Sequence, residues 1–296
     1  MLKVKLKPNK LRNILLAVIP GLIVAGFWGF AGSNPRTLFD DSLPGLMIID
    51  ANDNDKKTII AANPLETEWQ CGDDLEYEDE TYATVLINDQ CWMAENLNTG
   101  TRIDGVNEQD NDSVIQKYCY NNSDANCTTD GGLYQWAQAM DLPYTCNSTS
   151  TCTINTPHQG ICPDGWHIPS DQDWYDLTDY LTANGQYWCG NDMSTYIAKS
   201  LATTDDVQPN WTNSNTACCV GNDRSTNNLT GFSVLPAGYR LTDGSFGGRT
   251  LSSYLWSASQ HIATQAWPRN LLYNSATVGR NVGSKMSGFS VRCIKD

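Results

Sequence analysis

The chain has 296 residues, of which 40% are hydrophobic, 18% charged and 10% aromatic, with ten tryptophans. A disordered chain lacks this much apolar side-chain area, so the composition excludes one. The formal net charge is −14, and it is more negative still once the five basic residues near the amino terminus are set aside. Because so acidic a surface repels phosphate backbones, we expect no nucleic-acid partner.

Residues 14–31 form an uncharged run behind a basic segment. As a helix of ~1.5 Å per residue this run measures about 27 Å, close to the ~30 Å hydrocarbon core of a bilayer. Residues 1–31 are therefore either a cleaved signal peptide, with Gly29 and Ala31 before the cleavage site, or an uncleaved anchor with Trp28 at the interface. Both interpretations predict an extracellular or cell-surface body, with membrane contact only through residues 14–31 of an uncleaved chain.

Residues 32–70 are polar and interrupted by prolines, which predicts a solvated spacer. Asp50, Asn52 and Asn54 imitate the start of a calcium-binding loop. Such a loop needs glycine at its sixth position and glutamate at its twelfth, where this chain has aspartate and Ala61. The spacer is therefore not expected to bind calcium.

Eleven cysteines in an exported chain indicate disulfide bonds. Close spacing predicts three local pairs, and two further pairs are longer-range. In one of the longer-range pairs, either of two adjacent cysteines could be the second partner. The expected pairs are Cys71–Cys91, Cys119–Cys127, Cys146–Cys152, Cys189 with Cys218 or Cys219, and Cys162–Cys293. Closing the last loop, of about 130 residues, contributes roughly 5 kcal/mol in the chain-entropy description.

Residues 71–296 have the pattern of an α+β domain. Trp174, Leu177 and Leu181 recur at helical spacing, which predicts a helix that Ser170 begins and Gly185 ends. A second helix is expected over 195–201 and a short helical segment over 132–140. β-Branched and aromatic runs predict short strands at 82–88, 91–97, 232–235, 239–241, 254–258, 265–273 and 288–294.

Six motifs in order closely resemble the Fibrobacter succinogenes major paralogous domain: Trp92–Asn98, Leu133–Trp136, Cys162–Ser170, Gly231–Arg240, Leu255–Ser257 and Gly288–Cys293. The resemblance covers about residues 71–296. It implies a disulfide-stapled C-type-lectin-like fold with two main helices and short antiparallel sheets, related to the formylglycine-generating enzymes. It also makes Cys162–Cys293 the counterpart of the end-to-end disulfide of lectin folds.

The sequence disfavours catalysis. Formylglycine-generating enzymes use a pair of reactive cysteines, and no cysteine of this chain lies in a matching motif. A zinc site of His158, Cys162 and His167 lacks a second nearby cysteine, and His167 is expected to be buried with its hydrogen bonds satisfied. Asp205 and Asp206 could serve a glycosidase, but adjacent acids are usually only solvated. A formylglycine-generating-enzyme-like or glycosidase-type enzyme, or a passive envelope protein, remains the alternative.

The segment Trp211–Asn213 is similar to the Trp-Asn-Asp stretch beside calcium in C-type lectins. Its third position is asparagine and no Glu-Pro-Asn motif occurs, so calcium-dependent sugar binding is not expected, although calcium as a cofactor stays open. Trp211 itself is expected in the core.

The last forty residues interleave framework residues with arbitrary ones, which resembles the variable region of diversity-generating retroelement targets. In such targets the variable positions lie on the exposed face of a C-type-lectin-like fold; drift in a surface hairpin is the alternative. We expect aromatic and arginine anchors, with the arbitrary residues pointing to solvent. The expected ligand-binding residues are Trp267, Pro268, Arg269, Leu272, Tyr273, Ser275, Gly279, Val282, Gly283, Ser284, Met286 and Ser287.

These observations predict an exported recognition or adhesion module. Its ligand is expected to be a glycan or a protein on the surface of a cell or phage.

Overall fold

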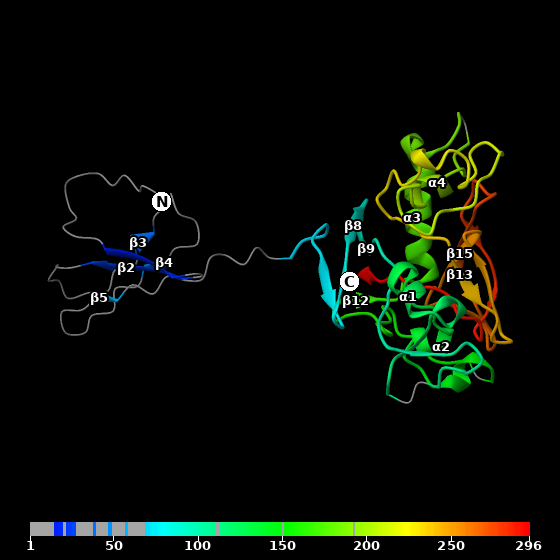
Figure 1. Ribbon diagram of the computed structural model, residues 1–296, viewed down its shortest axis with the longest axis horizontal. Helices are drawn as coiled ribbons and strands as arrows, with labels where there is room; N and C mark the ends of the chain where they lie inside the picture. Colours follow the sequence, from blue (N-terminus) through cyan, green and yellow to red (C-terminus); the bar gives the residue numbers. More distant parts are fainter. Residues whose placement is uncertain are drawn as a thin grey trace. The chain divides into compact units, whose positions relative to one another are not determined.

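The computed structural model describes residues 69–296, except 111–112, 150 and 192, together with the backbone of five short strands nearer the amino terminus. The chain divides into two compact units, Met1–Trp69 and Gln70–Asp296, whose elements are labelled in Figure 1.

The first unit contains strands where the sequence predicted a helix. β1 pairs antiparallel with β2, and both lie within the apolar run 14–31, whose Val and Ile residues favour extended backbone. The helix expected there is therefore wrong for the described part of the run, and the described residues contain no helix long and apolar enough to cross a membrane. The calcium-like segment at Asp50 lies outside the described residues. The five strands are β1 (Leu15–Ile19), β2 (Leu22–Phe27), β3 (Leu38–Phe39), β4 (Met47–Ile48) and β5 (Lys57–Thr58).

The second unit is α+β, as predicted, with few helices, several small sheets and five disulfides. Its α-helices are α1 (Asp124–Asp130), α2 (Trp136–Ala139), α3 (Asp171–Ala183) and α4 (Ala198–Leu201). Its first strands are β6 (Leu75–Tyr77), β7 (Glu80–Tyr82), β8 (Thr84–Ile87), β9 (Gln90–Met93), β10 (Thr101–Ile103), β11 (Gln116–Tyr118) and β12 (Trp166–His167). The later strands are β13 (Ala237–Arg240), β14 (Phe246–Arg249), β15 (Ser252–Leu255), β16 (Gln260–Ile262), β17 (Gln265–Ala266), β18 (Arg269–Leu272), β19 (Gly279–Arg280), β20 (Gly283–Ser284) and β21 (Ile294–Lys295).

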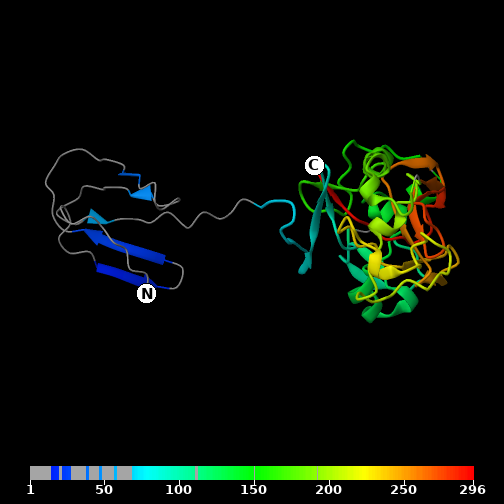
Figure 2. The same ribbon diagram turned by 90° about the horizontal axis from the view of Figure 1, so that it is seen from above.

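Three sheets organise the second unit: β12-β21-β9-β8, β14-β13-β15-β18-β19 and β16-β17-β20. In both ribbon views the orange strands around β13 and β15 gather on one side of this unit (Figures 1 and 2), whereas the last strand, β21, lies beside β9 and β12 at the carboxy terminus (Figure 1). The expectation of purely antiparallel sheets is wrong at two places, because β13 pairs parallel with β15 and β10 pairs parallel with β11.

The predicted elements differ from the observed ones where tertiary contacts intervene. The strand expected over 265–273 is split into β17 and β18 around Pro268, which has no N–H to give to a ladder. The segment 232–235 makes only an isolated bridge at Val234, and the second main helix reduces to the single turn of α4. The structure therefore has one long helix instead of two.

The long helix α3 forms as the sequence predicts. The Ser170 side chain accepts a hydrogen bond from the backbone N–H of Asp173, whose carboxylate accepts one from the N–H of Ser170. This reciprocal pair satisfies two donors at the helix start. Trp174, Leu177 and Leu181 are all buried, on one side of the helix.

The core surrounds α3. Trp174 lies 4.8 Å from Trp92 of β9, measured between ring centroids, and Phe232 meets both rings edge-on. Leu255 of β15 belongs to the same buried cluster, so α3 packs between two of the sheets, as Figure 1 shows. Trp211 is fully buried in this cluster, as expected.

All five expected disulfides form. Cys189, whose partner the sequence left open, is bonded to Cys218, and Cys219 is free and buried. Cys162–Cys293 joins residues 131 positions apart and attaches the last strand to the segment before β12.

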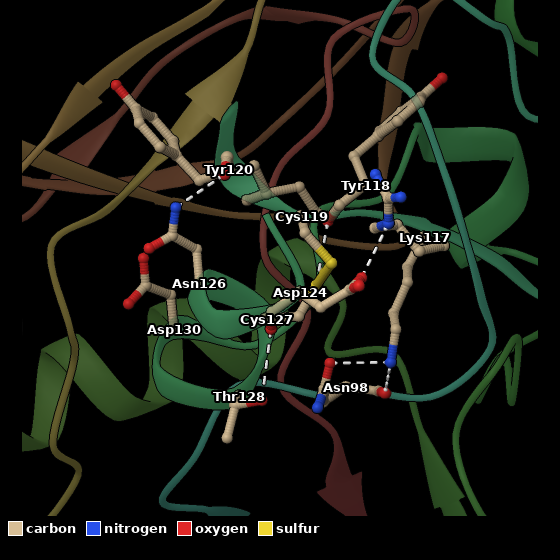
Figure 3. Close-up of a disulfide and its surroundings, with 12 residues drawn as sticks. Asn98, Lys117, Tyr118, Cys119, Tyr120, Asp124, Asn126, Cys127, Thr128 and Asp130 are labelled. Carbon is tan, nitrogen blue, oxygen red and sulfur yellow. Dashed lines mark hydrogen bonds and ion pairs between the residues drawn. A yellow bond between two sulfur atoms is a disulfide. The ribbon is translucent and has the colours of Figure 1, made fainter. Parts of the chain in front are cut away.

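Helix α1 was not predicted, and a disulfide accompanies it. The bond Cys119–Cys127 fixes the helix to the strand end before it (Figure 3). At the other end of α1 the buried Asp130 carboxylate pairs with Arg249 of β14 at 2.6 Å. A helix of seven residues is marginal alone in water, so these two tertiary links explain why it forms here.

His167 is buried between two carboxylates, in agreement with the expected satisfied histidine. Its Nδ1 lies 2.7 Å from Asp296 and its Nε2 lies 3.4 Å from Asp173. Burial acts to lower the pKa of His167, but hydrogen bonds and charge from Asp173 and Asp296 outweigh it, so the pKa is raised above 6.5.

This raised pKa predicts a pH-dependent stability. The contribution of the His167 cation is fully present below the unfolded pKa and is lost as pH rises through the higher folded pKa. We expect the free energy of unfolding, measured with denaturant, to fall more between about pH 5.5 and about pH 8.5 for the wild type than for His167→Gln. The variant His261→Gln, which changes an exposed histidine, serves as control and should lose as much as the wild type. An equal fall in the free energy of unfolding for all three proteins would contradict the role given to His167.

The long-range disulfide predicts a stability hierarchy. Replacing Cys162 and Cys293 together by alanine should lower the free energy of unfolding by about 5 kcal/mol, against about 2 kcal/mol for replacing Cys146 and Cys152, because the second loop is far shorter. Urea titrations of the two double variants measure the difference, and equal losses would refute the loop-length explanation.

Candidate recognition surface

The three-stranded sheet β16-β17-β20 presents one face to solvent. Ile262 pairs with Gln265, and Gln265 pairs with Ser284, so these three side chains share a face. Continuing the register places Trp267 opposite Val282 on that same face. We call this surface the Trp267 face; its members are Ile262, Gln265, Trp267, Arg280, Val282 and Ser284.

Residues 280–282 are all exposed, and from Val282 to Lys285 outward and inward positions alternate. Arg280 and Val282 are exposed, at 45% of the side chain and 41% of the residue, and Ser284 is partly exposed. Gly283 and Lys285 are buried instead. A Cβ at Gly283 would lie 2.9 Å from the Phe289 ring, so the inward positions are sterically fixed while the outward ones are not.

Trp267 is held rigidly at the centre of this face. The Arg280 guanidinium carbon lies 3.6 Å from the centroid of its ring, and His261 meets the ring edge-on at 4.6 Å. Arg280 is itself fixed, because its Nη2 donates to Asp171 at 2.8 Å and its Nε at 2.9 Å. A partly exposed aromatic ring without rotational freedom is well suited to act as a binding anchor.

Asp171 joins this face to helix α3. Its carboxylate also forms an ion pair with the buried Arg269 at 2.7 Å, and its backbone carbonyl accepts from Arg269 Nη2 at 3.1 Å. Burial acts to raise the pKa of Asp171, but hydrogen bonds from Arg280 and Arg269 outweigh it, so the pKa is lowered. One carboxylate in the first turn of α3 therefore neutralises two arginines from the carboxy-terminal strands.

Lys285 fixes the underside of the same segment. Its side chain is fully buried, with Nζ 3.9 Å from the centroid of the Trp136 ring, and it donates to the carbonyl of Cys146 and to Gln260 Oε1, both at 3.0 Å. Burial lowers the pKa of Lys285 to about 8. The segment is thus attached to the loop closed by Cys146–Cys152.

The structure brings together part of the predicted site. Trp267, Val282 and Ser284 share the Trp267 face, and Val282 points to solvent as expected. Met286 lies instead in the turn after β20, where its sulfur accepts a hydrogen bond from Tyr144 Oη. Arg269, Pro268 and Gly283 are buried, so their assignment to an exposed face is wrong. Arg269 is drawn inward by Asp171, and Gly283 packs against Pro268.

The remaining predicted residues lie elsewhere. Leu272 and Gly279 belong to the sheet of β18 and β19, and they are partly exposed there. Tyr273 packs against the main core, and its carbonyl accepts from Gly221. Two partly exposed serines complete the set: Ser275 lies beside the 219–221 loop and Ser287 closes a turn before Gly288.

Sequence reasoning missed Ile262 as part of this surface, and it missed Asp171, His261 and Lys285 as the residues that hold it in place. One signal was available: residues 244–295 contain no aspartate or glutamate, although the whole chain has 33. The centres of protein interfaces are depleted in charged residues. A long stretch without acidic residues in an otherwise acidic protein is therefore a signal for such a surface.

The residues considered for metal binding and catalysis are not brought together. Cys162 is in a disulfide, and His158 Nε2 lies 2.8 Å from the carbonyl of Met140. Asp205 and Asp206 are exposed. In the part of the chain that the structure describes, no three His, Cys, Asp or Glu side chains are grouped so as to hold a metal ion.

Comparison with known proteins gives one match. The sequence pattern of the Fibrobacter succinogenes major domain matches residues 85–295, a stretch that contains the whole Trp267 face. Neither the curated proteins nor the solved structures include a match to the chain.

The Asp171 contacts predict a specific loss of stability. Asp171→Asn leaves the buried Arg269 without a counter-charge, so the free energy of unfolding should fall by about 3 kcal/mol. Asp176→Asn removes an exposed carboxylate from the same helix and should change it by less than about 0.5 kcal/mol. Urea unfolding of both variants provides the measurement; similar values for the two would show that Asp171 does not hold Arg269.

Proposed function

The chain belongs to the Fibrobacter succinogenes major domain family, and from that premise we propose that its second unit is an exported recognition module that binds a ligand on another surface through the Trp267 face. The observation that carries the proposal is the alternation of outward and inward positions along residues 282–285 beside Trp267. Val282 and Ser284 project outward beside a fixed Trp267, while Gly283 and Lys285 are locked inward. Recognition surfaces typically combine rigid aromatic anchors, such as Trp267 here, with neighbouring side chains that can be exchanged.

The proposal includes an extracellular setting. Five disulfides stabilise a unit of modest size, which is typical of proteins exported to an oxidising compartment. The basic and apolar amino terminus supports export, as a signal or as an anchor.

The proposal also includes a C-type-lectin-like fold and a non-catalytic role. The long-range bond Cys162–Cys293, which joins the last strand to the middle of the unit, supports the fold assignment. Ten of the eleven cysteines are in disulfides and Cys219 is buried, which supports binding over the cysteine chemistry of formylglycine-generating enzymes.

Diversification is a finer part of the same proposal. Val282 and Ser284 are the predicted variable positions that the Trp267 face exposes, and changes there leave the inward contacts of Gly283 and Lys285 untouched. A reverse transcriptase gene with a template repeat beside the coding sequence would support this part, and its absence would oppose it.

Binding of the full chain to a panel of intact cells tests the module. Val282→Asp places a charge at the centre of the face and should lower binding at least about tenfold, which is ~1.4 kcal/mol. The control Leu86→Asp changes a residue of β8 that is 57% exposed and should leave binding unchanged. Melting temperatures of both variants should stay close to that of the wild type.

Two outcomes would contradict the proposal. Melting of the Val282→Asp variant would show that this position is structural, and unchanged binding would show that the ligand is held elsewhere.

A further inference from the structure

Three of the polar side chains around the Trp267 face already have partners within the protein. Arg280 donates to Asp171 through Nε and Nη2, the Asn281 amide donates to Asn270, and Ser284 Oγ accepts from the N–H of Met286 at 3.4 Å. A glycan offers many hydroxyl groups, each of which needs a donor or acceptor when it is buried against protein. Engaged polar groups therefore make this face a poor match for sugar hydroxyls.

Apolar side chains form an exposed part of the face. Ile262 is 48% exposed and Val282 is 41% exposed, and Trp267 is partly exposed beside them. Trp and Arg are enriched in protein–protein interfaces, whereas Asp, Glu and Lys are depleted. The face contains both enriched types, and the acid-free stretch 244–295 supplies every residue in it.

The rest of the chain supplies a strong negative field. It has 33 acidic residues against 13 lysines and arginines, because residues 244–295 contain six of the chain's 19 basic residues and none of its acids. A field of this sign attracts basic partners during diffusion and repels a second copy of the chain. The partner best suited to the molecule thus has an apolar contact patch within a basic surface.

From these three observations we infer that the Trp267 face binds a protein whose contacting patch is apolar and whose surrounding surface is rich in lysine and arginine. The inference rests on the proposed function and names its ligand class. Apolar contact with Ile262, Val282 and Trp267 provides the affinity, and the acidic body accelerates encounter with the basic surroundings.

Arrays of defined probes test this with the full chain. One array carries synthetic peptides that share a core of aromatic and aliphatic residues and are flanked by lysines, by serines or by glutamates; another carries neutral and acidic glycans. We expect binding in the order lysine, serine, glutamate, with the lysine advantage falling at high salt because screening weakens the acidic field. We expect no glycan signal.

Matched double variants locate the contact. Ile262→Ser with Val282→Ser removes two exposed apolar side chains from the face and should weaken binding of lysine-flanked peptides at least about tenfold, or ~1.4 kcal/mol. Leu86→Ser with Leu229→Ser removes two others, 57% and 60% exposed, outside the face, and should change binding by less than about twofold. Thermal unfolding of both should match the wild type.

The outcomes separate the inference from the proposed function. Glycan binding that the face double variant abolishes would overturn the inference and leave the recognition module standing. A preference for glutamate-flanked peptides, or no peptide binding at all, would overturn the inference. Peptide binding that both double variants reduce equally would place the contact outside the face and overturn inference and module together.

Discussion

The carboxylate of Asp171 is the contact on which the carboxy-terminal surface depends. It lies in the first turn of α3, where the aligned backbone N–H groups favour negative charge, and it holds Arg269 inside the protein and Arg280 outside it. Because Arg280 covers Trp267, the position of the exposed indole is set by a helix about a hundred residues earlier in the chain. The surface is thereby rigid although its strands are only two to four residues long.

Buried cations perform the same task elsewhere in the unit. Arg240 donates to the carbonyls of Gly105 and Met286, and Arg292 donates to Ser233 and Asn96. Together with Lys285 these side chains bind carbonyl groups of irregular segments that no regular ladder satisfies. Carbonyls buried without a partner cost free energy, so long basic side chains allow a loop-rich fold with small sheets to bury its backbone. This explains why the carboxy-terminal stretch is basic yet exposes little free charge.

The division between inward and outward positions connects the fold to its proposed use. Gly283 and Lys285 are fixed by close packing and hydrogen bonds, whereas the neighbouring Val282 is exposed. A side chain such as Val282 can change without a cost in packing, because surface substitutions away from special contacts alter stability little.

The sequence by itself determined the features that depend on local spacing. Helix α3 followed from the period of Trp174, Leu177 and Leu181 with a capping residue at Ser170, and the disulfides followed from short cysteine separations in a chain with many cysteines. Only the tertiary structure decided that Arg269 and Gly283 are buried and that Ile262 joins Trp267 on one face. A side chain's face in a two-residue strand depends on its register with partners, and a one-residue shift reverses it. Arg269 likewise has its counter-charge at Asp171, a partner that no pattern within the last forty residues encodes.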